Sequence, residues 1–79
     1  MTKSLYKPSY EKFRRHLKEL RLEKGFTQEE IAASLGKRQS FIQKCESGER
    51  RVDIVELDEI CTLLGSSLEE FVANYKKRK

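Results

Sequence analysis

The 79-residue chain contains one histidine, one proline, two cysteines and no tryptophan. Its histidine, His16, stands among Arg14, Arg15 and Lys18, with no carboxylate or cysteine at a spacing that suggests catalysis or metal binding. The sequence also has no glycine-rich phosphate loop. Nothing is therefore left to carry enzymatic chemistry, and we expect a surface histidine and a protein that is not an enzyme.

The two cysteines, Cys45 and Cys61, lack the paired-cysteine or histidine spacing of a zinc site. Both fall at apolar positions of predicted helices, where a free cysteine behaves as a small hydrophobic residue. We expect reduced, buried thiols, with a disulfide or a redox switch as the alternative. No metal and no cofactor is expected.

Long apolar runs are missing as well. None approaches the ~20 residues that a membrane-spanning helix needs, and the polar start MTKSLYK lacks the apolar core of a signal peptide. We expect a cytoplasmic protein without a membrane partner. A chain this short forms one domain and buries only ~60% of the surface that the unfolded chain exposes, so its stability is expected to be marginal.

Charge is distributed unevenly along the chain. The formal net charge is +4, yet residues 53–73 contain six acidic residues and no basic one, whereas residues 1–26 contain eight basic and three acidic residues. Residues 37–52 are also basic, with five basic and two acidic residues. A fold that gathers the basic elements on one side presents a positive surface to a polyanion, which is typical of a nucleic-acid-binding protein.

Residues 27–48, TQEEIAASLGKRQSFIQKCESG, predict two short helices joined by a tight turn. Thr27 and Glu30 form a capping box, because the threonine oxygen can accept from the Glu30 N–H while the carboxylate reaches back. The first helix therefore begins at Gln28 and closes at Gly36, which can take a positive φ. Its apolar face consists of Ile31, Ala32 and Leu35.

The second helix of this stretch, at about 39–47, is mostly polar. Ile42, Cys45 and Glu46 share one face. The remaining surface carries amides, hydroxyls and long cations, namely Arg38, Gln39, Ser40, Gln43, Lys44 and Ser47. Such side chains hydrogen-bond base edges, and a solvated helix face is the alternative. The spacing of Ala32, Gly36 and Ile42 favours the first interpretation, because it allows close helix approach, a turn and an anchor to the core.

At these residues the sequence resembles the helix-turn-helix of the phage-repressor and Cro-like family, also called the xenobiotic-response-element family of bacterial regulators. The resemblance extends from about Phe13 to Val72, through TQEEIA, LG, QSFIQKCESGERR and VELDEICTLLG. It implies an all-α, compact five-helix, lambda-repressor-like DNA-binding domain with its helix-turn-helix at about 28–47. Lys37 stands where the family usually has a small apolar residue, and Arg38 where it often has a capping serine or threonine.

The resemblance also implies roles for individual residues. Three would read bases in the major groove: Gln39, Ser40 and Lys44. Five would bind phosphates, either at the edge of the groove or from the loop after the second helix: Gln28, Arg38, Gln43, Arg50 and Arg51. Solvated loop arginines are the alternative for the last two. In the family pattern Arg21 pairs with the glutamate that is Glu46 here, which implies a partly buried ion pair between the first helix and the recognition helix.

The other helices follow from caps and apolar stripes. Ser9 is expected to cap a first helix that ends at Gly25 and buries Tyr10, Phe13, Leu17 and Leu20. Asp53 with Glu56 predicts a capping box for a fourth helix, and Ser67 with Glu70 predicts one for a fifth. The expected division is a flexible arm over residues 1–8, the domain over 9–75 and a basic tail over 76–79.

We therefore expect a sequence-specific DNA-binding transcriptional regulator, a repressor rather than an activator, that recognises double-stranded DNA as a homodimer. One short helix reads only a few base pairs, so two copies about 34 Å apart would match successive major-groove faces. Candidate dimer contacts are Val52, Ile54, Val55 and the last helix. An antitoxin or a protein-interaction module with the same fold remains the alternative function.

Overall fold

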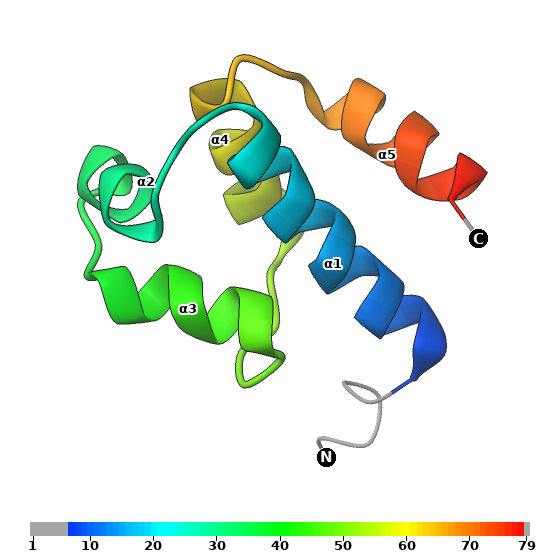
Figure 1. The fold of residues 1–79 in the computed structure, drawn as a ribbon, viewed down its shortest axis with the longest axis horizontal. Coiled ribbons are helices and arrows are strands. Elements are labelled where there is room, and N and C mark those ends of the chain that lie inside the picture. The colour runs from blue at the N-terminus through cyan, green and yellow to red at the C-terminus, as the bar shows by residue number, and fades with distance from the viewer. Residues whose placement is uncertain (1–6, 79) are drawn as a thin grey trace.

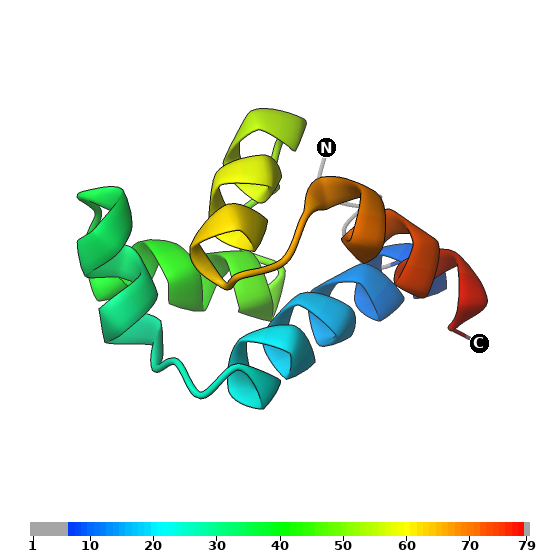
Figure 2. The ribbon, with the colours of Figure 1, turned by 90° about the horizontal axis from the view of Figure 1, so that it is seen from above.

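The structure, a computed structural model, describes residues 7–78 as five helices without a strand. The helices are α1 (Pro8–Glu23), α2 (Gln28–Leu35), α3 (Gln39–Ser47), α4 (Ile54–Leu63) and α5 (Leu68–Lys77). Helix α1 crosses the molecule, with α2 and α3 on one side and α5 on the other (Figure 1). Helix α4 lies between the α2–α3 pair and α5 (Figure 2). The all-α, five-helix fold expected from the sequence is confirmed.

All five helices contribute to one apolar core. Its buried members are Leu17, Ile31, Ala32, Ile42, Leu57, Ile60, Cys61, Leu64 and Phe71. Cys45 and Cys61 are both buried and unbonded, and burial raises the pKa of Cys61 to about 11, so its thiol is protonated at neutral pH. Among the described helices none is long and apolar enough to cross a membrane.

Side-chain caps fix the starts of three helices. The predicted capping boxes of Thr27 with Glu30 and of Asp53 with Glu56 are both complete. At α5 the box is only half formed, because Ser67 accepts from the Glu70 N–H at 3.1 Å whereas the Glu70 carboxylate accepts from the neighbouring Ser66 hydroxyl at 2.8 Å. The prediction of a full capping box at this helix was wrong, since a nearer donor competes for the carboxylate.

The start of α1 also differs from the expectation. Ser9 does not cap it, because the helix begins two residues earlier than expected, at Pro8, with no side-chain cap on Lys7. Proline suits this position, since its missing N–H would have had no helical partner and its φ is already helical. At the other end, α5 continues through Lys77 into the expected tail. Residues 1–6 of the expected arm and residue 79 lie outside the described residues.

His16 is half-buried between α1 and α5, so the expectation of a surface histidine was wrong. Its ring lies 4.5 Å from the ring of Phe71, and its buried Nε2 has no hydrogen-bond partner among the described residues. Burial, followed by the nearby charge of Arg78, lowers the pKa of His16 from its ordinary value of 6.5. The last helix thus covers a side of α1 that its own apolar stripe does not mark as buried.

The Arg21–Glu46 ion pair expected from the family pattern is present and joins α1 to α3. Arg21 donates from Nε to Glu46 Oε2 at 2.7 Å and from Nη2 to Oε1 at 3.1 Å. Its Nη1 donates to the Phe26 carbonyl at 2.8 Å, so every nitrogen of the guanidinium has an acceptor. The two side chains are only 8% and 5% exposed, which makes this a buried pair rather than a surface contact.

Substituting Glu46 by alanine should destabilise the protein by ~3–5 kcal/mol, because the Arg21 charge then stays buried without its partner. Urea unfolding followed by circular dichroism measures this change. Glu49→Ala, which removes an exposed carboxylate three residues along the chain, serves as the control and should change stability by less than ~0.5 kcal/mol. An unchanged unfolding midpoint for Glu46→Ala would contradict the structural importance of the pair.

The histidine makes stability depend on pH. The pKa of His16 is lower in the folded than in the unfolded protein, so the unfolded chain binds the proton more readily and the free energy of unfolding should fall as pH is lowered from about 7 to 5.5. His16→Gln should remove this part of the pH dependence. Equilibrium unfolding at several pH values tests it, and an equal pH dependence in both proteins would show that His16 is not the responsible group.

Candidate nucleic-acid interface

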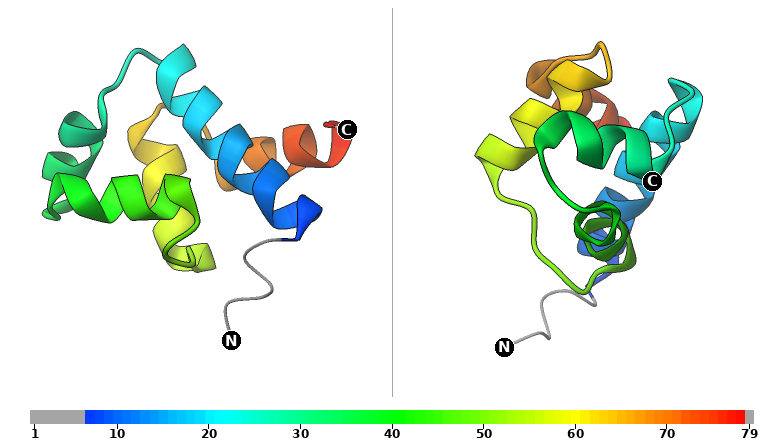
Figure 3. Two further views of the ribbon diagram at one scale, coloured as in Figure 1. Left: turned by 60° about the horizontal axis from the view of Figure 1, so that its bottom comes forward. Right: turned by 90° about the vertical axis from the view of Figure 1, so that its left-hand side faces the viewer.

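Helices α2 and α3 form a helix-turn-helix whose second helix lies at the edge of the molecule (Figure 3). Gly36 makes the turn in the left-handed region, at φ 70°. Ala32 and Ile42 are 1% and 3% exposed, so the small residue permits close approach of the helices and the larger one anchors α3 in the core. The mechanical roles expected for these three residues are those seen in the structure.

The outward surface of α3 and its preceding residue is polar and bears no carboxylate. Its exposed side chains are Arg38, Gln39, Ser40, Gln43, Lys44 and Ser47. Glu46, the acidic residue of this helix, is turned inward to Arg21. The exposed surface of α3 therefore offers amide, hydroxyl and ammonium donors, the groups that pair with base edges and phosphates.

A chain of polar contacts connects the buried ion pair to this surface. Gln28, at the start of α2, donates from Nε2 to Glu46 Oε1 at 3.0 Å. Gln39, the first residue of α3, donates from Nε2 to Gln28 Oε1 at 2.5 Å. The chain Arg21–Glu46–Gln28–Gln39 therefore joins three helices and fixes the orientation of an exposed amide.

The sequence assigned Gln28 and Gln39 separate roles and gave no sign that they touch. In the structure Gln28 is half-buried and Gln39 is exposed. The side-chain oxygen of Gln28 accepts the hydrogen bond that orients the Gln39 amide. One N–H of the Gln39 amide is engaged by Gln28, which leaves its second N–H and its carbonyl oxygen for other partners. That arrangement suits the bidentate recognition of an adenine edge.

The two adjacent arginines of the loop between α3 and α4 have different surroundings. Arg50 donates from Nη1 and Nη2 to the two carboxylate oxygens of Glu56 at 2.9 and 2.7 Å, whereas Arg51 is exposed. The loop begins at Gly48, where φ is 90° and an added Cβ would lie 2.7 Å from the guanidinium carbon of Arg14. The sequence had placed both Arg50 and Arg51 on phosphates and gave no sign of the pairing between Arg50 and Glu56.

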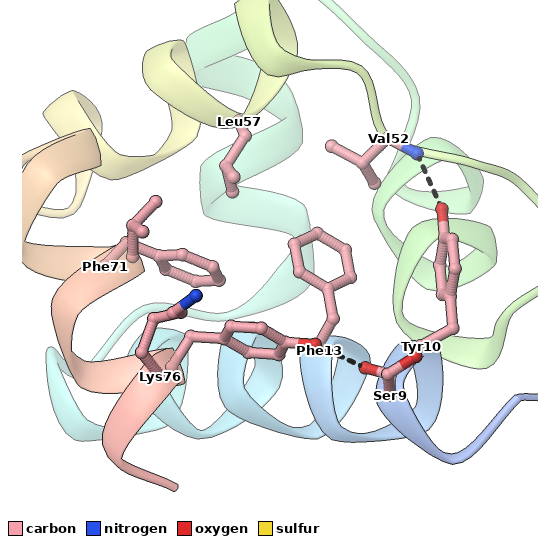
Figure 4. Close-up of a pocket in the computed structure, with 9 residues that line it drawn as sticks. Ser9, Tyr10, Phe13, Val52, Leu57, Phe71 and Lys76 are labelled. Atoms are coloured by element: carbon pink, nitrogen blue, oxygen red, sulfur yellow. Dashed lines mark hydrogen bonds between the residues drawn. The ribbon is translucent and has the colours of Figure 1, made fainter.

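A separate apolar groove lies away from α2 and α3. It has a volume of about 410 Å³ and is lined by residues of α1, α4, α5 and the loop before α4, among them Phe13, Val52 and Phe71 (Figure 4). The Tyr10 hydroxyl contacts the Val52 N–H at 3.4 Å across one edge of the groove. None of the residues that line it belongs to α2 or α3, so this groove is distinct from the polar surface of α3.

The acidic residues of the segment 53–73 lie outside α3. The carboxylates of residues 53–73 belong to α4, α5 and the residue that caps α4, and those of Asp58, Glu59, Glu69 and Glu70 are exposed. No Cα atom of α3 lies within 8 Å of a Cα atom of α5. Across the described residues no group of three or more histidine, cysteine or acidic side chains is placed to hold a metal.

Comparison with known proteins agrees with this geometry. Residues 17–71 match the family model described as helix-turn-helix. An uncharacterized HTH-type transcriptional regulator of Sinorhizobium fredii, y4dJ, is 42% identical over 53 residues, covering 67% of this chain and 69% of that protein. The crystal structure of a mutant of the restriction-modification controller protein C.Esp1396I is similar with a TM-score of 0.77 and 32% identity, over 84% of this chain and 88% of that one.

The matched segment contains the buried ion pair, the turn and the outward surface of α3, so the family and the geometry point to the same surface. The chain belongs to the helix-turn-helix family and is a DNA-binding transcriptional regulator.

Proposed function

We propose that this regulator is a sequence-specific repressor that inserts α3 into the major groove of double-stranded DNA. The observation that carries the proposal is the exposed, carboxylate-free surface of α3, held in place by the buried Arg21–Glu46 pair. Gln39, Ser40 and Lys44 are the proposed base readers, since they project from this surface. Occupying a duplex site excludes other proteins from it, which is the simplest regulatory effect that one DNA-binding domain exerts.

Phosphate contacts are proposed for the residues around the three base readers, which together we call the reading surface. Arg38 and Gln43 are exposed near the base readers, and Arg51 is exposed in the following loop. Gln28 contributes through the start of α2, where it also holds Gln39. Contacts of this kind set the register of the protein on the duplex without distinguishing bases. The proposal assigns no catalytic step to the chain and places it with bacterial DNA in the cytoplasm.

A homodimer is proposed because one α3 helix reads only a few base pairs. Exposed aliphatic side chains outside α3 support it: Ile54, Val55 and Val72 are 66%, 64% and 45% exposed, and Val72 lines the groove of Figure 4. Exposed aliphatic side chains of this size favour burial against a second copy. The operator would then contain two inverted half-sites about 34 Å apart.

Selection of bound duplexes from a random pool tests the base readers. The parent protein should select inverted half-sites, and Gln39→Ala and Lys44→Ala should each lose preference at particular bases, at a cost of ~1–3 kcal/mol per base. Arg51→Ala is the matched control, because removing a phosphate contact should weaken all duplexes alike. Unchanged preferences in both α3 variants would overturn the assignment of readers.

Salt dependence separates this function from the alternative of an antitoxin or protein-interaction module. For DNA binding, the logarithm of affinity should fall with the logarithm of salt concentration by about 0.9 per phosphate contact, and Arg51→Ala should reduce the slope by about 1. Fluorescence anisotropy with a labelled duplex measures the slope. A protein partner whose binding persists at high salt, combined with a flat DNA curve, would favour the alternative.

A further inference from the structure

Arg50 is turned onto the protein by contacts to three different segments. Both terminal nitrogens pair with the carboxylate of Glu56 in α4, and Nη1 also donates to the Arg51 carbonyl at 2.7 Å. The guanidinium carbon lies 4.6 Å from the ring centroid of Phe41 in α3. A planar guanidinium that pairs bidentately along its edge and stacks on an aromatic face has its orientation fixed in both respects.

Phe41 connects this cluster to the reading surface. It follows Ser40 directly and precedes the buried Ile42, and it packs against the apolar core. Lys37, in the turn before α3, places its ammonium 5.3 Å from the same ring. The ring thus meets cations from the segments that precede and follow α3, and its face attracts both electrostatically.

The cluster matters because α3 and α4 meet through side chains alone, among them the core residues Ile42 and Ile60. No Cα atom of α3 lies within 8 Å of a Cα atom of α4, although α2 and α3 approach closely. The angle of α3 to α4 is therefore set by side chains. The pair of Arg50 with Glu56 crosses this space and rests on Phe41, in the first turn of α3.

A phosphate role fits Arg50 poorly. Its hydrogen-bonding edge is occupied by Glu56, whose negative charge offsets its own, and a phosphate would have to displace that carboxylate. The hydrogen bonds from Arg50 lower the pKa of Glu56 below its usual range, so the carboxylate stays ionised at neutral pH. Arg51, next along the chain, is exposed and is the better candidate for the phosphate contact.

We propose that Arg50 and Glu56 are positioning residues that hold α3, through Phe41, at the angle from which it reads bases, and that they determine sequence preference rather than phosphate affinity. The inference rests on the proposed reading of bases by α3. A positioning role and a phosphate role predict different effects on DNA binding when the pair is broken. Freeing Arg50 from Glu56 would strengthen binding to every duplex if Arg50 served phosphates, whereas it impairs discrimination if the pair positions α3.

The experiment compares Glu56→Gln and Arg50→Lys, which keep a polar side chain but lose the bidentate charged pair. Anisotropy titrations against the preferred duplex and single-mismatch duplexes should show at least a fivefold loss of discrimination in both, within the range that one mismatched base pair usually contributes. The salt slope should stay that of the parent. Asp53→Ala is the control for the α4 cap that Glu56 also serves, and Arg51→Ala is the control for loss of a loop cation; both should keep the parent's discrimination.

Two results would overturn the inference. One is tighter binding of Glu56→Gln to all duplexes with a steeper salt slope, which would make Arg50 a phosphate ligand. The other is unchanged discrimination in Glu56→Gln and Arg50→Lys while both remain folded by circular dichroism. If Lys44→Ala also kept the parent's discrimination, base reading by α3 would fail together with the inference; if Lys44→Ala lost it, only the positioning role would fail.

Discussion

The buried ion pair between Arg21 and Glu46 is the contact on which the arrangement of the reading surface depends. Two charges below a tenth exposed are costly to remove from water, and the cost is offset only because the guanidinium finds a carboxylate and a carbonyl for all of its nitrogens. The pair ties α3 to α1 and turns the helix's carboxylate away from its outer surface. It also supplies the acceptor for Gln28, which in turn holds Gln39.

A second ion pair, between Arg50 and Glu56, anchors α3 through Phe41, and the two pairs resemble one another chemically. Each is an arginine that pairs bidentately with a glutamate on another element, one buried and one half-exposed. Held by both pairs, α3 presents hydrogen-bond donors outward and apolar side chains inward. The exposed side chains of α3 include cations and amides but no carboxylate, whereas exposed carboxylates stand on the neighbouring segments at Glu29, Glu30 and Glu49.

Local signals in the sequence predicted most of the fold, because helix starts and ends depend on neighbouring residues. Thr27 with Glu30 and Asp53 with Glu56 gave correct starts, and the ion pair of Arg21 with Glu46 followed from the resemblance to a family. The errors arose where a tertiary contact decides. His16 is covered by α5, which its own helix cannot reveal. The pairing of Arg50 with Glu56 was not foreseen for a similar reason, since the loop between them has no periodic signal, and the phosphate role of Arg50 stays a prediction. At the start of α1 the error has a local cause, since Pro8 begins the helix two residues before the start that a Ser9 cap would give.

The central claim is that the outer surface of α3 enters the major groove, and intermolecular nuclear Overhauser effects in a protein–DNA complex test it most directly. A protein of 9.3 kDa bound to a short selected duplex is well suited to this measurement. The account predicts contacts from side-chain protons of Gln39, Ser40 and Lys44 to protons on the major-groove edges of bases. Contacts that come instead from α4 or α5, with the α3 side chains unaffected by DNA, would contradict it.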